Sequence, residues 1–223
     1  MAINENVIVV IYGRPGIGKS RCLTESALQK MRTAPVTVLC SRNITPRYFV
    51  QRLAKELRIE KQWTIPDLEE AVADRLARYP RPLFIDQANF LHERSLGTVC
   101  HLWEIARIPV VLAGTKALYE LFTRSKLTEE VRDQLSSRVA LHYLLSELTL
   151  QEAKAIIRHA MGEEATDEIV AQVYSLTGGV HRHVDMIIPR IFHLRELNSQ
   201  ALAEGKVKMS QLIALAGARL MVG

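Results

Sequence analysis

The stretch that decides the fold of this 223-residue chain is residues 7–20, which read VIVVIYGRPGIGKS. Its first half, residues 7–12, is apolar on both faces and rich in β-branched residues, as in a buried strand of a parallel sheet. Its second half, residues 13–20, fits the pattern G-x-x-x-x-G-K-[ST] in full. Helical spacing follows over residues 19–31. Strand, glycine-rich loop and helix in this order predict a loop that binds phosphate groups, whereas a chance match would make it an ordinary turn.

Each residue type in this loop has a physical task. Glycines let the backbone wrap a phosphate with its N–H groups pointing inward, and the start of the next helix adds partial positive charge. Lys19 should reach the β- and γ-phosphates of a nucleotide, and the Ser20 hydroxyl should hold Mg²⁺. The predicted cofactors are therefore ATP and Mg²⁺. The predicted nucleotide contacts are Gly13, Arg14, Pro15, Gly16, Ile17, Gly18, Lys19, Ser20 and Arg21.

Such a site needs a carboxylate near the metal, at the end of another buried strand. Residues 83–86 (LFID) supply Asp86, which would contact Mg²⁺ directly or through water. The alternative for Asp86 is a helix N-cap or turn residue.

The next residue, Gln87, stands where many ATPases of this layout have the glutamate that polarises the attacking water. Because glutamine cannot accept a proton, the sequence predicts ATP and Mg²⁺ binding with slow hydrolysis. Two origins stay open: a deliberate Glu→Gln change, favoured because the exchange is nearly isosteric, and a natural departure with hydrolysis slow or assisted from elsewhere.

The remaining pattern predicts an α/β fold of the P-loop type, three layers deep, with a parallel five-stranded sheet and a small helical lid. The α/β domain is expected over residues 1–147 and the lid over residues 148–223. Further strands are expected at residues 35–40, 82–86, 109–113 and, more weakly, 139–143. Helices are expected at 46–57, 67–79, 95–107 and 128–135. In the lid they are expected after a capping box at Thr149, then over 167–176, over 181–197 with a kink at Pro189, and over 210–221.

Composition excludes several classes of protein. Hydrophobic residues make up 48% and charged residues 24%, which are globular values and exclude a disordered chain. No apolar run is long enough to cross a bilayer, and the start has no basic region typical of a secretory signal. The three cysteines are odd in number, far apart and without a metal pattern, so we expect a reducing cytoplasmic compartment, and small buried side chains rather than disulfides or zinc ligands. The net charge of +5 permits a nucleic-acid partner without requiring one.

The order of these motifs resembles the AAA+ ATPases, and within them the transposition regulators of the MuB, TnsC and TniB type, with the secretion ATPase ExeA as a cousin. The softer similarities are DQAN at residues 86–89, VVLAGT at 110–115, Ser137-Arg138 before the last strand, and TGGVHR at 177–182. The resemblance implies three further catalytic residues beside Lys19, Asp86 and Gln87. They are Thr115 as sensor 1, Arg138 as an arginine finger for a neighbouring subunit, and Arg182 as sensor 2; the alternatives are a helix N-cap, a surface arginine and a solvated helix residue.

The resemblance also implies partners. Proteins of this type assemble with ATP into rings or helical filaments on duplex DNA, present that DNA to a transposase, and come apart after hydrolysis. The family usually carries an extra N-terminal region, so a first strand this close to Met1 suggests a trimmed ATPase core or a minimal member. Two other functions stay open: a secretion-associated ATPase that acts on protein or cell-wall partners, and a nucleotide-gated scaffold without useful turnover.

Candidate DNA contacts come from the loops that follow the predicted strands, where basic and small polar residues suit phosphate contacts. No base-reading motif is present, so weak sequence specificity and strong salt dependence are expected. The alternative is a set of solvated loop charges. The candidates are Arg42, Arg47, Arg94 and Lys116.

Overall fold

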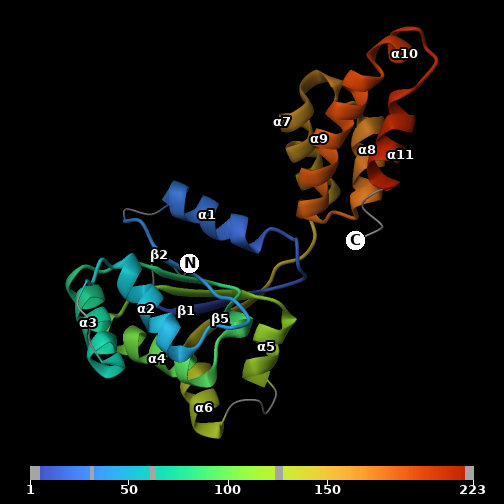
Figure 1. The fold of residues 1–223 in the computed structure, drawn as a ribbon. Coiled ribbons are helices and arrows are strands. Elements are labelled where there is room, and N and C mark those ends of the chain that lie inside the picture. Colours follow the sequence, from blue (N-terminus) through green and yellow to red (C-terminus); the bar gives the residue numbers. More distant parts are fainter. Residues whose placement is uncertain (1–5, 31–32, 61–63, 124–127, 219–223) are drawn as a thin grey trace. The chain divides into compact units, whose positions relative to one another are not determined.

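The computed structural model describes residues 6–30, 33–60, 64–123 and 128–218 (Figure 1). The chain divides into two compact units. One runs to Arg14 and continues from Lys19 to Leu145, and the other consists of Pro15–Gly18 together with the chain from Ser146 onward. The tip of the glycine-rich loop thus groups with the C-terminal helices.

The first unit contains a five-stranded sheet in which every pair of neighbours is parallel, in the order β2-β3-β4-β1-β5. The predicted fold class is confirmed. Because parallel neighbours cannot be joined by tight hairpins, each connection crosses over through helices. The strands are β1 (Ile8–Tyr12), β2 (Val36–Leu39), β3 (Leu83–Asp86), β4 (Val110–Gly114) and β5 (Val139–Leu144).

Successive side chains along each strand point to opposite faces of the sheet, so the core has one part on each face. One set of strand residues, including Val10, Ile85 and Leu112, packs with the helices that lie between β2 and β5. The other set, including Phe84 and Val111, packs with Leu23 of the first helix. Figure 1 shows this first helix on one side of the sheet and the others on the opposite side. The helices of this unit are α1 (Lys19–Lys30), α2 (Pro46–Glu56), α3 (Ile65–Arg78), α4 (Glu93–Ala106), α5 (Lys116–Thr123) and α6 (Glu129–Arg138), with a short 3-10 turn η1 (Ala88–Phe90).

Several helix boundaries differ from the prediction, and for α3 the reason is a local cap that was not recognised. Helix α3 begins two residues early, since the Thr64 hydroxyl accepts from the Asp67 N–H and Pro66 fits the first turn. Helix α4 also begins early, at Glu93, and α6 extends to Arg138. Helix α5 was not predicted; it is only eight residues long.

The second unit is helical, as predicted after residue 147. The capping box is present: the Thr149 hydroxyl accepts from the Glu152 N–H, and the Glu152 carboxylate accepts from the Thr149 N–H. Helix α9 continues through Pro189. The predicted helix over residues 210–221 begins at Met209, and its last residues lie outside the described part. The helices are α7 (Leu150–Met161), α8 (Asp167–Thr177), α9 (His181–Leu197), α10 (Ser199–Ala203) and α11 (Met209–Ala218), with a 3-10 turn η2 (Gly162–Glu164).

The cysteines are only partly as expected. Cys40 and Cys100 are buried, and burial raises the pKa of their thiols to about 12 and about 11. Cys22 is exposed on the solvent side of α1, so the expectation that all three are buried is wrong for this residue. None of the helices in the described ranges combines the length and apolar character needed to span a bilayer.

Candidate nucleotide-binding site

The glycine-rich loop leaves the carboxyl end of β1 and is tied to the neighbouring strand at its start. The Gly13 N–H donates to the Gly114 carbonyl over 3.2 Å, which fixes the loop against the end of β4. Gly16 and Gly18 have φ values of 83° and 100°, a backbone region that side chains disfavour. The loop therefore has the left-handed turns that let successive N–H groups face one anion.

Lys19, the first residue of α1, folds back over this loop. Its Nζ donates to the Gly13 carbonyl over 3.0 Å and to the Arg14 carbonyl over 2.7 Å. The sequence-predicted cation therefore lies at the loop. Phosphate oxygens, being charged, would make stronger bonds to an ammonium than these neutral carbonyls do.

Ser20 and Asp86 come together although 66 positions separate them. The Ser20 hydroxyl donates to Asp86 Oδ2 over 2.5 Å, and the Asp86 side chain is buried at the end of β3. A hydroxyl and a carboxylate are the hard oxygen ligands that Mg²⁺ takes, so the two residues fit the predicted ion. The described residues contain no group of three or more histidine, cysteine or acidic side chains suited to a metal. A Mg²⁺ ion held here would thus complete its shell with phosphate and water oxygens.

Gln87 follows at a strained position. Its φ of 54° is left-handed, and its N–H donates to Asp86 Oδ1 over 2.8 Å, so both oxygens of Asp86 have a partner. The Gln87 side chain is exposed. A left-handed non-glycine residue costs about 1 kcal/mol or more, and such positions concentrate at functional sites.

Asn89 joins the ends of two strands, a role that sequence reasoning did not assign. Its Oδ1 accepts from the Thr115 N–H over 3.1 Å, just beyond β4. A Cβ on Gly114 would lie 2.9 Å from the same oxygen, so a side chain there would displace the amide. Asn89 thereby holds Thr115, the predicted sensor 1, beside β3. A polar residue three positions after Asp86 was the signal that could have found it.

Arg182 lies at the loop tip within the helical unit. Its N–H donates to the Gly16 carbonyl over 2.9 Å, and a Cβ on Gly16 would lie 3.3 Å from Arg182 Cβ. A Cβ on Gly18 would lie 3.5 Å from the ring of the neighbouring His181. The Nδ1 atom of His181 is 3.0 Å from Asp185 Oδ2. The start of α9 and the loop tip are therefore packed together, which places the predicted sensor 2 beside the loop.

Arg138 lies elsewhere. It ends α6 and pairs with Glu104 of α4. The next residue, Val139, is in register with Ile8 at the start of β1, whereas the loop follows the end of β1. Arg138 therefore lies near the amino-terminal end of β1, whereas its own chain's glycine-rich loop follows the carboxyl-terminal end of that strand.

The four candidate DNA contacts lie at the same end of the sheet, where the strands have their carboxyl termini. Arg42 and Arg47 follow β2, Arg94 lies in the first turn of α4 beyond β3, and Lys116 begins α5 after β4. All four side chains are exposed. This end also contains the glycine-rich loop, because the loop follows the parallel strand β1.

The surroundings shift the pKa of two groups near these strand ends, the Cys40 thiol and the Glu93 carboxyl. Burial chiefly raises the pKa of the Cys40 thiol, and the charge of Asp86 adds to the effect, so the thiol stays protonated near neutral pH. The hydroxyl and N–H of Thr128 donate to Glu93, which lowers the pKa of that carboxyl. Glu93 thereby anchors the residue before α6 to the first turn of α4.

Comparisons with known proteins agree with this geometry. A family model described as "AAA domain" matches residues 3–122, which is more than half of the chain. No curated protein sequence matches the chain.

Several solved structures share the fold at low identity. The Orc1 protein of Aeropyrum pernix, solved in complex with DNA, aligns with a TM-score of 0.58 and 15% identity, covering 96% of this chain and 59% of that one. The Walker-type ATPase PABY2304 of Pyrococcus abyssi gives 0.61 and 12%, covering 96% and 67%. Domain III of the Thermotoga maritima replication initiator DnaA gives 0.57 and 15%, covering 93% and 82%. The chain thus spans little more than half of the Orc1 chain.

The matched region contains the loop, Asp86 and Thr115, and the solved structures share the parallel sheet around them. The chain therefore belongs to the AAA domain family, with the fold of the P-loop AAA+ ATPases.

Proposed function

We propose that this protein is an ATPase that binds ATP and Mg²⁺ at residues 13–21, assembles with further copies on duplex DNA, and regulates a transposase. The observation that supports nucleotide binding most strongly is the convergence of three groups at one edge of the sheet. They are the loop with Lys19 folded over it, the Ser20 hydroxyl, and the buried Asp86 carboxylate bonded to that hydroxyl.

The residues of the chain have distinct tasks in this proposal. Lys19 exchanges the carbonyls of Gly13 and Arg14 for phosphate oxygens. Ser20 and Asp86 hold Mg²⁺, which when bound neutralises charge on the phosphates. Gln87 can orient a water molecule through its amide but cannot remove the proton of that water. The proposed protein therefore binds ATP well and turns it over slowly.

Assembly would depend on Arg138. It lies at the sheet edge away from its own loop and is paired with Glu104 across α4 and α6. A γ-phosphate on a neighbouring copy would compete with Glu104 for the guanidinium, because arginine binds phosphate oxygens in two-pronged fashion. ATP, but not ADP, would therefore favour contact between copies.

DNA binding is supported by the exposed cations Arg42, Arg47, Arg94 and Lys116, which follow three successive strands of the sheet. Two structurally similar proteins are described as DNA complexes: the Orc1 protein with DNA, and a replication initiator DnaA bound to AMPPCP and single-stranded DNA. The narrower assignment to transposition rests on the motifs at residues 86–89, 110–115 and 177–182.

The test is retention on a fluorescent duplex, measured by anisotropy with ATP, with ADP and without nucleotide. We expect ATP to increase retention, and rising salt to reduce it because phosphate contacts release counterions. Arg42→Ala with Arg47→Ala should weaken binding, whereas the exposed lid variant Lys208→Gln should not. Equal retention in all three nucleotide states, or none at all, would contradict the proposal.

The transposition step needs its own assay. Duplex coated with the protein and ATP should become a preferred insertion target for a purified transposase. Insertion that ignores the coated duplex would leave a DNA-binding ATPase but remove transposition.

A further inference from the structure

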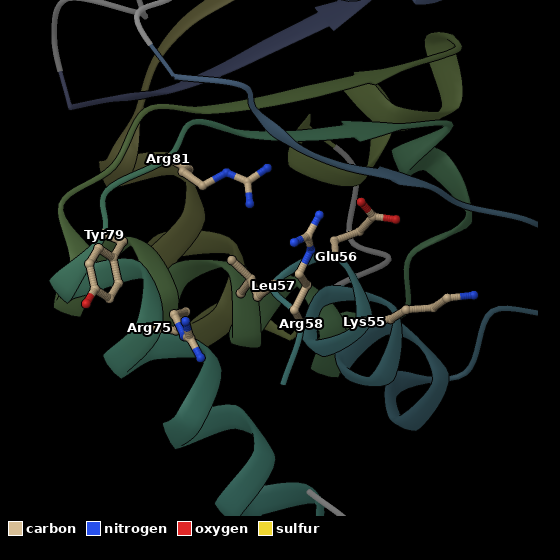
Figure 2. Close-up of a pocket in the computed structure, with 7 residues that line it drawn as sticks. All are labelled: Lys55, Glu56, Leu57, Arg58, Arg75, Tyr79 and Arg81. Atoms are coloured by element: carbon tan, nitrogen blue, oxygen red, sulfur yellow. The ribbon is translucent and has the colours of Figure 1, made fainter. Parts of the chain in front are cut away.

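A basic groove lies at the amino edge of the sheet, opposite the glycine-rich loop. It consists of two adjoining hollows of about 540 Å³ and about 580 Å³, both lined by Arg58, Arg75 and Tyr79. Figure 2 shows the first hollow, between the C-terminal ends of α2 and α3 and the start of β3, with the side chains of Arg58 and Arg81 directed into it. The cations of the basic groove are Lys55, Arg58, Arg75, Arg78 and Arg81.

Positive charge exceeds negative charge in the basic groove. Five cations face three carboxylates, which belong to Glu56, Glu60 and Asp74. Helix dipoles explain Lys55, Arg75 and Arg78, because cations in the last turn of a helix are stabilising. The same field also favours a cation at Arg58, which directly follows the C-cap residue Leu57 of α2.

Arg81 has a structural task as well. Its guanidinium donates to the carbonyls of Ala34 and Pro35, just before β2, over 2.8 and 3.0 Å. These bonds fix one wall of the basic groove, so the first hollow has a rigid cationic side.

Arg58 occupies a position that favours glycine. The Arg58 N–H donates to the Lys55 carbonyl and the Ile59 N–H to the Ala54 carbonyl, which together form a Schellman motif at the end of α2. Its φ is 55°, so a side chain there costs stability relative to glycine. An arginine is therefore present where the backbone alone would select the smallest residue.

Arg107 is a second arginine with a left-handed backbone, and a contact of its side chain accounts for its presence. It also follows a helix, α4, with a φ of 50°, and its guanidinium lies 4.9 Å from the centre of the Trp103 ring. That stacking contact repays part of the strain. In the described part of the chain no hydrogen bond, ion pair or ring contact engages the Arg58 side chain, which is exposed and lines both hollows.

We propose that the basic groove binds single-stranded nucleic acid through its phosphate backbone, independently of ATP. Guanidinium groups match phosphate oxygens in geometry, and two open adjoining hollows suit a chain of repeated phosphates better than one small anion. Tyr79 is 64% exposed beside Arg75, whose guanidinium lies 5.9 Å from the ring centre, and it offers a face on which an unpaired base can stack.

This activity goes beyond the proposed ATP-dependent retention on duplex DNA and does not rest on it. The basic groove lies at the amino edge of the sheet, whereas the loop and Arg42 lie at the carboxyl edge. An experiment can therefore reject binding by the basic groove without rejecting ATP-dependent retention on duplex DNA, and the reverse also holds.

The experiment measures anisotropy of a labelled oligothymidylate of about 20 nucleotides, long enough for one binding groove, without nucleotide and over a salt series. The test variant combines Arg58→Gly with Arg75→Gln. The matched control combines Arg107→Gly, another left-handed arginine after a helix, with Lys208→Gln on the lid. Both pairs remove two positive charges, but only the first alters the basic groove.

We expect the test variant to bind at least tenfold more weakly and the control to bind as the unchanged protein does. The slope of log K against log salt should become shallower by about 0.7 for each phosphate of the single strand that the variant no longer neutralises. Tyr79→Ala should weaken binding about tenfold by removing the stacking face. Arg58→Gly alone should raise the thermal midpoint, so misfolding cannot explain its weaker binding.

Two results would overturn the proposal. One is equal binding and equal salt slope for the test and control variants, which includes the case in which the unchanged protein does not bind the oligonucleotide. The other is tighter binding of poly-glutamate than of the oligonucleotide, abolished in the same variant, because the basic groove would then serve an acidic protein segment.

Discussion

Gln87→Glu changes a single amide to a carboxylate at the position where a base is expected. The backbone of Gln87 is already held at a φ of 54° by its N–H bond to Asp86, and the substitution leaves that bond intact. The side chain is exposed, so the new carboxylate needs no repacking. A positioned general base accelerates reactions by about 10²–10⁴-fold. This range equals about 3–5 kcal/mol of activation free energy, since each tenfold change is 1.36 kcal/mol.

The assay is phosphate release at saturating ATP, with ATP affinity measured in parallel. We expect Gln87→Glu to raise the rate by the factor above with ATP affinity nearly unchanged, and Gln87→Ala to leave the rate at or below that of the unchanged protein. The rate should rise with pH and then level off, because only the ionised carboxylate can accept the proton. A rate within twofold of the unchanged protein, at equal ATP affinity, would refute the reasoning.

Three further predictions concern stability and accessibility. A Cβ on Gly179 would lie 2.5 Å from the Leu148 carbonyl oxygen, whereas one on Gly205, with almost the same φ, meets nothing within 4 Å. Urea unfolding should therefore show Gly179→Ala to be about 1–3 kcal/mol less stable than Gly205→Ala, and equal stabilities would argue against the packing. The capping bonds lower the pKa of Glu152 below its ordinary 4.5, so its stabilising effect is present above that pH and is lost as the pH falls further. Glu152→Gln should therefore reduce the loss of unfolding free energy at acid pH. An equal loss in the unchanged protein and the variant would count against the cap. A thiol reagent at pH 8 should modify Cys22 alone in the folded protein and all three cysteines in denaturant; rapid reaction of more than one native thiol would contradict the burial.

The sequence was sufficient for features that depend on local pattern. Residues 13–20 predict the loop from glycine spacing and the two elements that flank it, and residues 83–86 predict a buried strand that ends in a carboxylate. The contact between Ser20 and Asp86 could be inferred as well, because the motif requires both groups near one metal.

Other features depend on distances between elements that are remote in the chain. The bond from Thr115 to Asn89 exists because β3 and β4 are neighbours, and that strand order is not written in any local pattern. The basic groove forms because the ends of α2 and α3 meet, so Arg58 and Arg75, 17 positions apart, line one hollow. Periodicity could identify α2 and α3, but it could not show that their C-terminal ends come together.

The most direct test of the whole interpretation is the affinity of the chain for a fluorescent ATP analogue, compared between the unchanged protein and Lys19→Ala. Lys19 lies over the loop that would hold the phosphates, and charge-assisted hydrogen bonds contribute about 1.5–3 kcal/mol each. We expect at least tenfold weaker binding for Lys19→Ala, weaker Mg²⁺ dependence for Asp86→Asn, and no change for Lys208→Ala. Equal affinity in the unchanged protein and Lys19→Ala would contradict the claim that this loop binds the nucleotide.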